Sequence, residues 1–348
     1  MSIYDYGWNE YFVQQWKQRN TDGMLAGRIV ADYGQLLRVM TDTGELCVNR
    51  QVKKLSNNLQ IAVGDWVELE YISEKELTIH DVLVRKTKFS RAAAGNEVKE
   101  QIVAANVDTV FLIQSLNRDF NMKRLERYLI AAWESGAVPV VVLTKADCCD
   151  DIADKMTIVY NTAPGVEVYA ISSVTGQGID EIRKYLAKGK TVALLGSSGV
   201  GKSTLVNTLA GEELLKTQSI REDDSRGRHT TTHRELILLP GGGLILDTPG
   251  MRMLSLWESD TGMEIMFGDV EDLTALCRFH DCKHQNEPGC AVREALNSGK
   301  LEMKRWESWL KLQKELAHLE AKKEGTVRLQ EKKWGREIAK YQKQLRKK

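Results

Sequence analysis

The spacing of hydrophobic positions changes along the chain and divides it into parts. The first part is short and aromatic. Its ring-bearing residues recur at the spacing of one face of a short helix: Tyr4, Tyr6, Trp8, Tyr11, Phe12 and Trp16. We expect this face to pack on the following domain, although a surface for a partner would show the same spacing.

From Met24 to about Lys88, short apolar segments alternate with polar positions and are separated by turn sequences. The segments cover residues 27–31, 36–40, 46–48, 66–72 and 78–84. Five short strands in sequence predict a small β-barrel of the OB-fold type. The open face of such a barrel commonly binds oligonucleotides, but a purely structural barrel has the same periodicity.

From Asp108 the pattern alternates between strands and helices. Strands are expected at 109–114, 138–144, 157–161, 166–172, 191–195, 235–239 and 243–247, and helices at 123–135 and 180–186. This order predicts a parallel α/β sheet in a domain that ends near Leu276. A long helical pattern follows Asn297. The residues that we expect to face inward are Trp306, Trp309, Leu310, Leu312 and Leu316.

Composition narrows the class of protein. The 348 residues are 42% hydrophobic, which is enough for two or three domains with cores of their own. The longest apolar runs are too short to cross a bilayer, and the six cysteines do not form the framework of a secreted disulfide-rich fold. We therefore expect a soluble cytoplasmic protein. The net charge is only +1, but lysine and arginine concentrate after Leu301.

A phosphate-binding loop occupies residues 196–203, with the sequence GSSGVGKS. It follows the strand at 191–195 and precedes the helical stretch 204–210, which is the context that a Walker A loop requires. Its glycines permit close approach of backbone amides to phosphate, Lys202 reaches the β- and γ-phosphates, and Ser203 is a magnesium ligand. A turn that binds nothing is the alternative. The expected nucleotide contacts are Gly196, Ser197, Ser198, Gly199, Val200, Gly201, Lys202, Ser203 and Thr204.

Three further segments fit a guanine nucleotide. The sequence DTPG at residues 247–250 follows a strand, so Asp247 can hold a magnesium-bound water and the Gly250 amide can contact the γ-phosphate. TKAD comprises Thr144, Lys145, Ala146 and Asp147, and SSVTGQG begins with Ser172 and Ser173. The Asp147 carboxylate can accept two hydrogen bonds from guanine, which adenine cannot offer, and Lys145 lies over the base. Thr144 stands where the usual motif has asparagine.

The order of these motifs is reversed relative to ordinary GTPases. TKAD and SSVTG precede the phosphate loop, whereas they usually follow it. The domain is therefore predicted to be circularly permuted, with the same sheet but relocated termini.

A second cluster has the spacing of a zinc site. Cys277, Cys282, His284 and Cys290 form C-x4-C-x-H-x5-C, and zinc takes such sulfur and nitrogen ligands in a closed, structural site. His280 is a rival ligand. Reduced thiols in a helical hairpin are the alternative.

With the permuted order, the RGRHTTT segment, DTPG and this cluster together, the chain resembles the ribosome small-subunit-dependent GTPases, known as RsgA or YjeQ, over essentially its whole length. The resemblance implies an OB-fold, a permuted GTPase domain, a C-terminal zinc domain with His284 as the ligand, and a late role in small-subunit maturation. The expected parts are an aromatic segment (1–23), the barrel (24–90), the GTPase domain (91–272) and a mostly α zinc domain with a basic tail (273–348).

The segment from Arg226 to Glu235 lies where a GTPase carries its first switch. Thr231 or Thr232 is expected to complete the magnesium shell. Met251 follows DTPG and cannot orient a water as glutamine does, so His229 is the candidate catalytic residue, as similar family members carry a histidine there. Contact of His229 with RNA or solvent is the alternative.

The expected partners are the small ribosomal subunit with its rRNA, and GTP or GDP, with no membrane and a monomeric protein. Candidate phosphate contacts are Arg85, Lys86, Lys88, Arg91 and the basic tail, each of which also suits a solvated face. One zinc ion and one magnesium ion with GTP are the expected cofactors. A nucleotide-gated RNA-binding module and a signalling GTPase remain as alternative classes.

Overall fold

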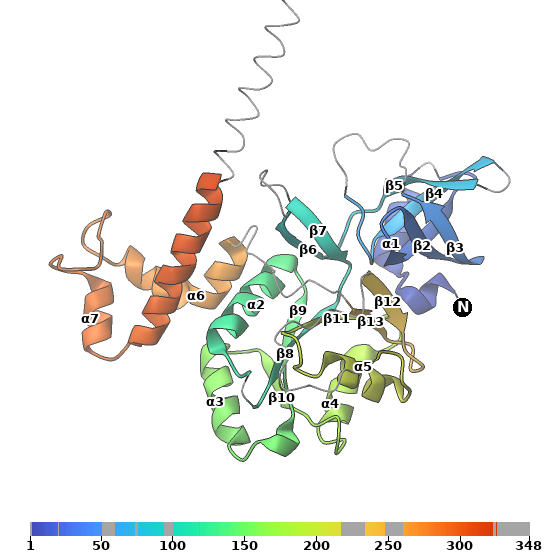
Figure 1. Ribbon diagram of the computed structural model, residues 1–348. Helices are drawn as coiled ribbons and strands as arrows, with labels where there is room; N and C mark the ends of the chain where they lie inside the picture. Colours follow the sequence, from blue (N-terminus) through green and yellow to red (C-terminus); the bar gives the residue numbers. More distant parts are fainter. Residues whose placement is uncertain are drawn as a thin grey trace, which may run out of the picture. The chain divides into compact units, whose positions relative to one another are not determined.

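The computed structural model of the chain describes residues 2–19, 21–50, 60–73, 76–93, 100–117, 119–216, 234–247, 260–322 and 325. The chain divides into two compact units. The first contains residues 1–91 and 102–254, and the second contains residues 92–101 and 255–348 (Figure 1).

The centre of the first unit is a sheet with five parallel strands. Their spatial order is β10-β9-β8-β11-β13, followed by the antiparallel strand β12. The strands are β8 (Thr109–Ser115), β9 (Val138–Thr144), β10 (Glu167–Ala170), β11 (Thr191–Leu195), β12 (Arg234–Leu238) and β13 (Leu244–Asp247). Every residue of β8 and β11 is buried, as expected of parallel strands that are covered on both faces.

Helices cover both faces of this sheet. They are α2 (Met122–Ser135), α3 (Ile152–Thr162), α4 (Ile179–Arg183) with the short η3 (Lys184–Leu186), and α5 (Lys202–Ala210). Figure 1 shows α2 and α3 on one side of the strands and α4 and α5 on the other. Phe111, Ile113, Leu194 and Ile182 belong to one buried cluster that also contains Leu205, so α4 and α5 share a core with the sheet. This is a doubly wound α/β fold.

The N-terminal strands form an OB-like barrel. They are β1 (Leu25–Asp32), β2 (Leu36–Thr41), β3 (Gly44–Asn49), β4 (Trp66–Ser73) and β5 (Glu76–Val82). β1 pairs with β2 and β4, and all of these pairings are antiparallel, as are β2 with β3 and β4 with β5. β1 also pairs with β12, where Ala31 lies opposite Glu235, so the barrel and the central sheet are continuous.

The aromatic segment packs on the barrel, as predicted. It contains η1 (Ile3–Tyr6) and α1 (Glu10–Lys17). The Trp8 and Phe12 rings are buried, with centroids 4.7 and 5.6 Å from that of Trp66 at the start of β4. Burial of these rings fixes α1 to the barrel.

Arg28 of β1 connects three segments of the first unit. Its side chain is 2% exposed, and its guanidinium donates to the carbonyl oxygens of Tyr6, Gly64 and Asn106, the last two at 3.3 and 2.9 Å. Burial lowers the pKa of Arg28 to about 10. Gly64 is required at this junction, because a Cβ there would lie 2.0 Å from the carbonyl oxygen of Ala105.

The second unit is mainly helical in its described residues from Asp260 onward. It contains α6 (Asp260–Ala275), α7 (Ala291–Asn297) and a helix at residues 303–322. Trp306 and Leu312 of the last helix are buried, as its pattern predicts, and Trp309 stacks on Trp306 with ring centroids 5.0 Å apart.

Most predicted strands occur within two residues of their expected limits, but one prediction is wrong. Residues 157–161 were expected as a strand and lie inside α3, where Val159 is the buried residue. The strands β6 (Lys88–Ala92) and β7 (Glu100–Ala105) form a separate two-stranded sheet that the hydrophobic pattern did not predict.

Replacement of Arg28 tests the junction. We expect Arg28→Met to lower the free energy of unfolding by about 3 kcal/mol, because buried carbonyl groups that lose their donor each cost about 1–3 kcal/mol. Lys184→Met is the control: Lys184 pairs with Glu167 at the surface, where about 1 kcal/mol or less is expected. Urea unfolding measures both values, and equal losses in the two variants would contradict the role of Arg28.

Candidate functional site

The predicted nucleotide-binding segments gather at one edge of the central sheet. The phosphate loop follows β11, TKAD begins with the last residue of β9, SSVTGQG follows β10, and Asp247 ends β13. Since these strands are parallel, their carboxyl ends lie at the same edge, where doubly wound sheets bind ligands.

The backbone of the phosphate loop has the conformation that its glycines allow. Gly199 and Gly201 have φ angles of 75° and 99°, and α5 begins at Lys202 immediately after them. Position 196 requires glycine, because a Cβ there would lie 2.6 Å from the carbonyl oxygen of Ile113. The loop therefore turns directly into a helix whose first amides have no partner inside the helix, which is a favourable place for an anion.

Polar side chains hold the loop in place. The Lys202 ammonium donates to the carbonyl oxygens of Gly196 and Ser197 at 2.8 and 2.6 Å, so its charge lies over the loop. The Ser197 hydroxyl donates to the carboxylate of Asp119, which also pairs with Arg124 at 2.8 Å. The sequence motifs did not indicate Asp119. It follows β8, a parallel strand whose carboxyl end also lies at this edge of the sheet. That position is the signal by which it could have been found.

Thr144 links TKAD to the phosphate loop. Its side chain is buried, and its hydroxyl lies 2.6 Å from the carbonyl oxygen of Val200 and 3.3 Å from that of Gln114. Lys145 adopts a left-handed conformation, with φ of 60°, and its ammonium donates to the Gly199 carbonyl oxygen at 3.0 Å. The Thr144 hydroxyl thus joins the two loops, although threonine replaces the asparagine of the usual motif.

The Asp147 carboxylate is exposed and oriented. Its Oδ1 accepts a hydrogen bond from the Ser172 hydroxyl at 2.5 Å, and its Oδ2 lies 3.2 Å from the Cys148 thiol. The hydrogen bond from Ser172, followed by that from Cys148, lowers the pKa of Asp147. Ala146 is buried, and its amide donates to the Ile171 carbonyl oxygen. An ionised acceptor therefore faces outward between the two base-binding loops.

The SSVTGQG loop is closed on itself. The buried Ser172 hydroxyl accepts from the amides of Val174 and Thr175, each at 3.2 Å. The Ser172 amide donates to the carbonyl oxygen of Gln177, so this amide is already engaged within the loop. This leaves the neighbouring Ser173 amide as the candidate donor to a guanine carbonyl oxygen.

Several candidates lie outside the described residues. These are His229, Thr231, Thr232 and Gly250. Asp247 is half-buried at the end of β13, opposite Glu235 of β12. Ser203 is half-buried in the first turn of α5, next to Lys202.

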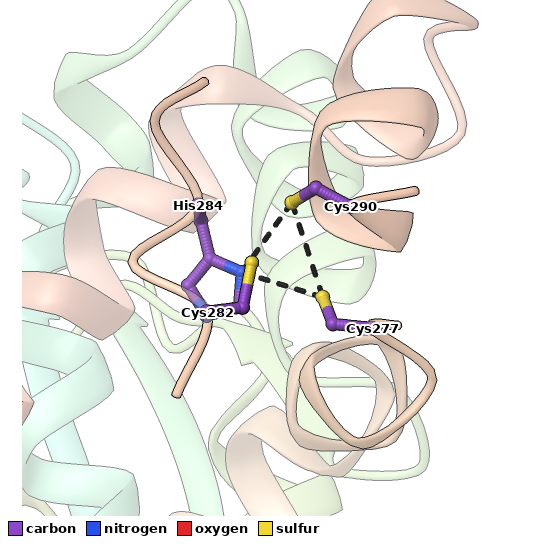
Figure 2. Close-up of side chains that lie close together, drawn as sticks. All are labelled: Cys277, Cys282, His284 and Cys290. Atoms are coloured by element: carbon purple, nitrogen blue, oxygen red, sulfur yellow. Dashed lines mark hydrogen bonds between the residues drawn. The ribbon is translucent and has the colours of Figure 1, made fainter. Parts of the chain in front are cut away.

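The cysteine–histidine cluster assembles in the second unit. Figure 2 shows the side chains of Cys277, Cys282, His284 and Cys290 directed toward one another, and their ligand atoms all lie within 4.8 Å of one another. His284 Nδ1 is 3.5 Å from the sulfurs of both Cys277 and Cys290, which are 3.9 Å apart. A tetrahedral zinc site with its usual bond lengths has sulfur–sulfur edges of about 3.8 Å and sulfur–nitrogen edges of about 3.6 Å. The donor set and its spacing therefore fit zinc.

The surroundings of the cluster support this geometry. His284 has a φ of 58°, and its ring packs edge-on against Trp306 at 5.3 Å. Burial disfavours the Cys277 thiolate, but hydrogen bonds from the amides of Val292 and Ala291 outweigh it and lower the pKa. The rival ligand His280 is exposed and lies outside the cluster.

The expected cationic contacts have different environments. Arg85 is mainly structural: its guanidinium pairs with the fully buried Asp65 at 2.6 Å and donates to the Gln60 carbonyl oxygen. Lys86 lies 3.2 Å from Asn9 Oδ1 and over the rings of Tyr11 and Phe12. The end of the basic tail lies outside the described residues. In the part of the chain that the structure describes, no helix has the length and hydrophobicity to span a bilayer.

Comparisons with known proteins agree with this arrangement. The family model of the RsgA GTPase matches residues 82–257. A Listeria innocua protein named small ribosomal subunit biogenesis GTPase RsgA 1 is 45% identical over 91% of this chain and 90% of its own. A protein of Lactiplantibacillus plantarum with the same name, numbered 2, is 45% identical over 85% of both chains.

Solved structures show the same fold. YjeQ from Thermotoga maritima is 27% identical, with a TM-score of 0.60 over 84% of this chain and 99% of its own. YloQ, described as a circularly permuted GTPase, is 23% identical with a TM-score of 0.57 over 86% of this chain and 97% of its own. The reversed motif order, the gathered loops and these matches together show that the chain belongs to the RsgA GTPase family.

Proposed function

We propose that the protein hydrolyses GTP to GDP and phosphate and assists late maturation of the small ribosomal subunit. The observation that carries the enzymatic part is the contact between Thr144 and Val200, which joins a guanine-type loop to a phosphate loop despite their reversed order. The biological part rests on the relatives, which are named small ribosomal subunit biogenesis GTPases.

The phosphate loop binds the triphosphate through its amides and Lys202. The relevant residues are Gly196, Ser197, Ser198, Gly199, Val200, Gly201, Lys202, Ser203 and Thr204. We expect Asp247 to hold a magnesium-bound water, the Gly250 amide to contact the γ-phosphate, and Ser203 with Thr231 or Thr232 to hold magnesium. Magnesium bound there neutralises negative charge that develops on the phosphate oxygens during transfer.

The base is selected by Asp147. Its lowered pKa keeps the carboxylate ionised, so both oxygens accept hydrogen bonds from the N–H groups of guanine. Ser172 orients this carboxylate, and the Ser173 amide donates to the guanine carbonyl. Thr144 and Lys145 hold the base loop against the phosphate loop, and Ala146 fixes the backbone between them.

Hydrolysis requires a group that orients water. Met251 is unable to do so, and His229 in the preceding switch segment is the residue that we assign to this role. We expect docking on the small ribosomal subunit to order the switch segment around GTP and so to accelerate turnover.

The cysteine–histidine cluster holds one structural zinc ion. Three thiolates and one imidazole leave no open position, so the metal stabilises the fold of residues 273–348 and does not take part in hydrolysis. The barrel (24–90), the zinc domain and the basic tail bind rRNA by charge, while residues 91–272 bind the nucleotide. We place the protein in the cytoplasm as a monomer.

Two other classes of protein would behave differently toward ribosomal subunits. A nucleotide-gated RNA-binding module would bind subunits without faster hydrolysis. A signalling GTPase would bind a protein partner and show no salt-sensitive cofractionation with subunits. The zinc cluster and the concentration of lysine and arginine after Leu301 argue against the signalling GTPase.

Subunit-dependent hydrolysis is the first test. We expect purified small ribosomal subunits to raise the GTPase rate at least about tenfold, and His229→Ala to abolish this stimulation while GTP binding is retained. Steady-state phosphate release measures the rate, and large subunits serve as the control. An unaltered rate with small subunits would reject the proposed function, and normal stimulation of the variant would remove His229 from the mechanism.

Exchange of Asp147 for asparagine tests base recognition. The amide of Asp147→Asn donates to the extra carbonyl of xanthine and no longer accepts from guanine, so we expect about 100-fold weaker GTP binding and a gain for xanthosine triphosphate. Calorimetry measures both affinities. Asp150→Asn is a matched control, since Asp150 is exposed nearby. The assignment fails if Asp147→Asn binds GTP normally.

Metal analysis tests the cluster. We expect about one zinc ion per chain, lost in Cys290→Ser but retained in Cys47→Ser, because Cys47 is an exposed cysteine of the barrel. Elemental analysis measures the metal, and circular dichroism during chelation follows the fold. A wild-type protein that is free of metal yet fully folded would contradict the zinc site.

A further inference from the structure

The turn between β8 and α2 is held firmly at both of its ends. Gln114 at the end of β8 is fully buried, and its side chain donates to the Asn121 carbonyl oxygen at 3.0 Å and accepts from the Asn121 N–H at 2.8 Å. The Asn121 side chain accepts from the Arg124 amide at 3.1 Å and so caps α2. The two ends of the turn are therefore fixed relative to each other, at the edge of the sheet where the nucleotide loops gather.

Asp119 lies in this turn and directs its carboxylate to the phosphate loop. Its Oδ2 accepts a hydrogen bond from the Ser197 hydroxyl. The carbonyl oxygen of the same Ser197 accepts from the Lys202 ammonium at 2.6 Å. Ser197 is thus held through its side chain by Asp119 and through its backbone by Lys202. The contact with Asp119 helps to set the direction of the loop backbone just before the exposed residues Ser198 and Gly199.

The negative charge of Asp119 works against phosphate binding. Its side chain is 33% exposed beside the loop, and an uncancelled carboxylate there would repel a phosphate group. A neutral side chain such as asparagine could accept the same hydrogen bond from Ser197 without this repulsion. An aspartate at this position therefore suits a phosphate site only when a nearby cation cancels its charge.

Arg124, in the first turn of α2, supplies the opposite charge. Its guanidinium lies 2.8 Å from Oδ1 of Asp119 and also donates to the Asp119 carbonyl oxygen. The two carboxylate oxygens thus have separate partners, since Oδ2 accepts from Ser197 and Oδ1 pairs with the cation. The buried Nε of Arg124 has no acceptor among the described residues. The contacts with Asp119 therefore fix the position of this guanidinium.

We propose that Asp119 and Arg124 are a pair of positioning residues for nucleotide binding. Asp119 orients the phosphate loop through Ser197, and Arg124 cancels the charge of Asp119 so that the loop keeps its attraction for phosphate. This proposal rests on the proposed function, in which the phosphate loop binds GTP. Both residues act through the loop and not on the reacting atoms.

Calorimetry with GDP and a non-hydrolysable GTP analogue, in the presence of magnesium, tests the pair on the full chain. We expect about tenfold weaker binding in Arg124→Gln, because the charge of Asp119 is then left uncancelled. Asp119→Asn keeps an acceptor for Ser197 and removes the charge, so it should bind within about twofold of the wild type. The double variant with both substitutions should recover the affinity that Arg124→Gln loses.

Removal of the acceptor separates orientation of the loop from charge. Asp119→Ala leaves the Ser197 hydroxyl without its acceptor, so we expect about tenfold weaker binding, which Asp119→Asn avoids. Salt gives a second measurement. An increase from about 50 mM to about 500 mM potassium chloride should reduce the deficit of Arg124→Gln relative to the wild type, since salt screens repulsion between charges, but not the deficit of Asp119→Ala.

Two matched controls remove exposed charges near the pair. Lys123→Gln replaces the cation next to Arg124 in α2, and Asp154→Asn replaces an exposed carboxylate in α3. Both variants should bind the nucleotides like the wild type. Circular dichroism during heating establishes that each variant is folded.

Three outcomes would overturn the proposal. Equal losses in Arg124→Gln and the double variant would show that the guanidinium supports the fold and does not act by cancelling the charge of Asp119. Wild-type affinity in both Arg124→Gln and Asp119→Ala would show that the pair has no part in nucleotide binding. A wild-type protein that binds neither nucleotide would reject the proposed function itself, and the role of the pair with it.

Discussion

The hydrogen bond from the Thr144 hydroxyl to the Val200 carbonyl oxygen is the contact on which the nucleotide site depends. The two residues are 56 positions apart, and together with the hydrogen bond from Lys145 to Gly199 the contact joins the TKAD loop to the phosphate loop. Buried in a region that excludes water, this bond keeps the base-binding loop at a fixed distance from the phosphate loop. A guanine nucleotide has fixed dimensions, so both loops must stay in register to bind it.

Reversal of the motif order leaves this contact intact because the sheet is held by hydrogen bonds between strands. β11 pairs with β8 and β13 whichever of them comes first in the chain. Relocated termini therefore change only the connections, which run over the surface. Because only the connections change, each loop keeps its local sequence, and the phosphate loop and TKAD can be recognised from it.

The sequence predicted those features whose information is local. Alternation defined the barrel strands, glycine spacing defined the phosphate loop, and ligand spacing located the cysteine–histidine cluster, in which the family resemblance selected His284 over His280. Residues 157–161 were misassigned because Thr157, Ile158 and Val159 favour a strand locally, while the surrounding residues continue a helix.

Long-range contacts had no such local signal. Arg85 pairs with Asp65 and Arg28 is buried among carbonyl groups, but an arginine is ordinarily expected to be exposed. Asp119 reaches the phosphate loop from the turn that follows β8. The pairing of β1 with β12 joins two regions more than 200 residues apart, which alternation within either strand does not indicate.

That pairing has a mechanical consequence. β12 begins directly after the segment in which the switch threonines are expected, and its Glu235 is paired with Arg38 of the barrel at 3.1 Å. A slip of one residue would turn the inward side chains of β12 outward, so the strand has a strongly specified position. Asp32 of β1 lies opposite Arg234, so β12 is fixed to the barrel wall from its first residue onward.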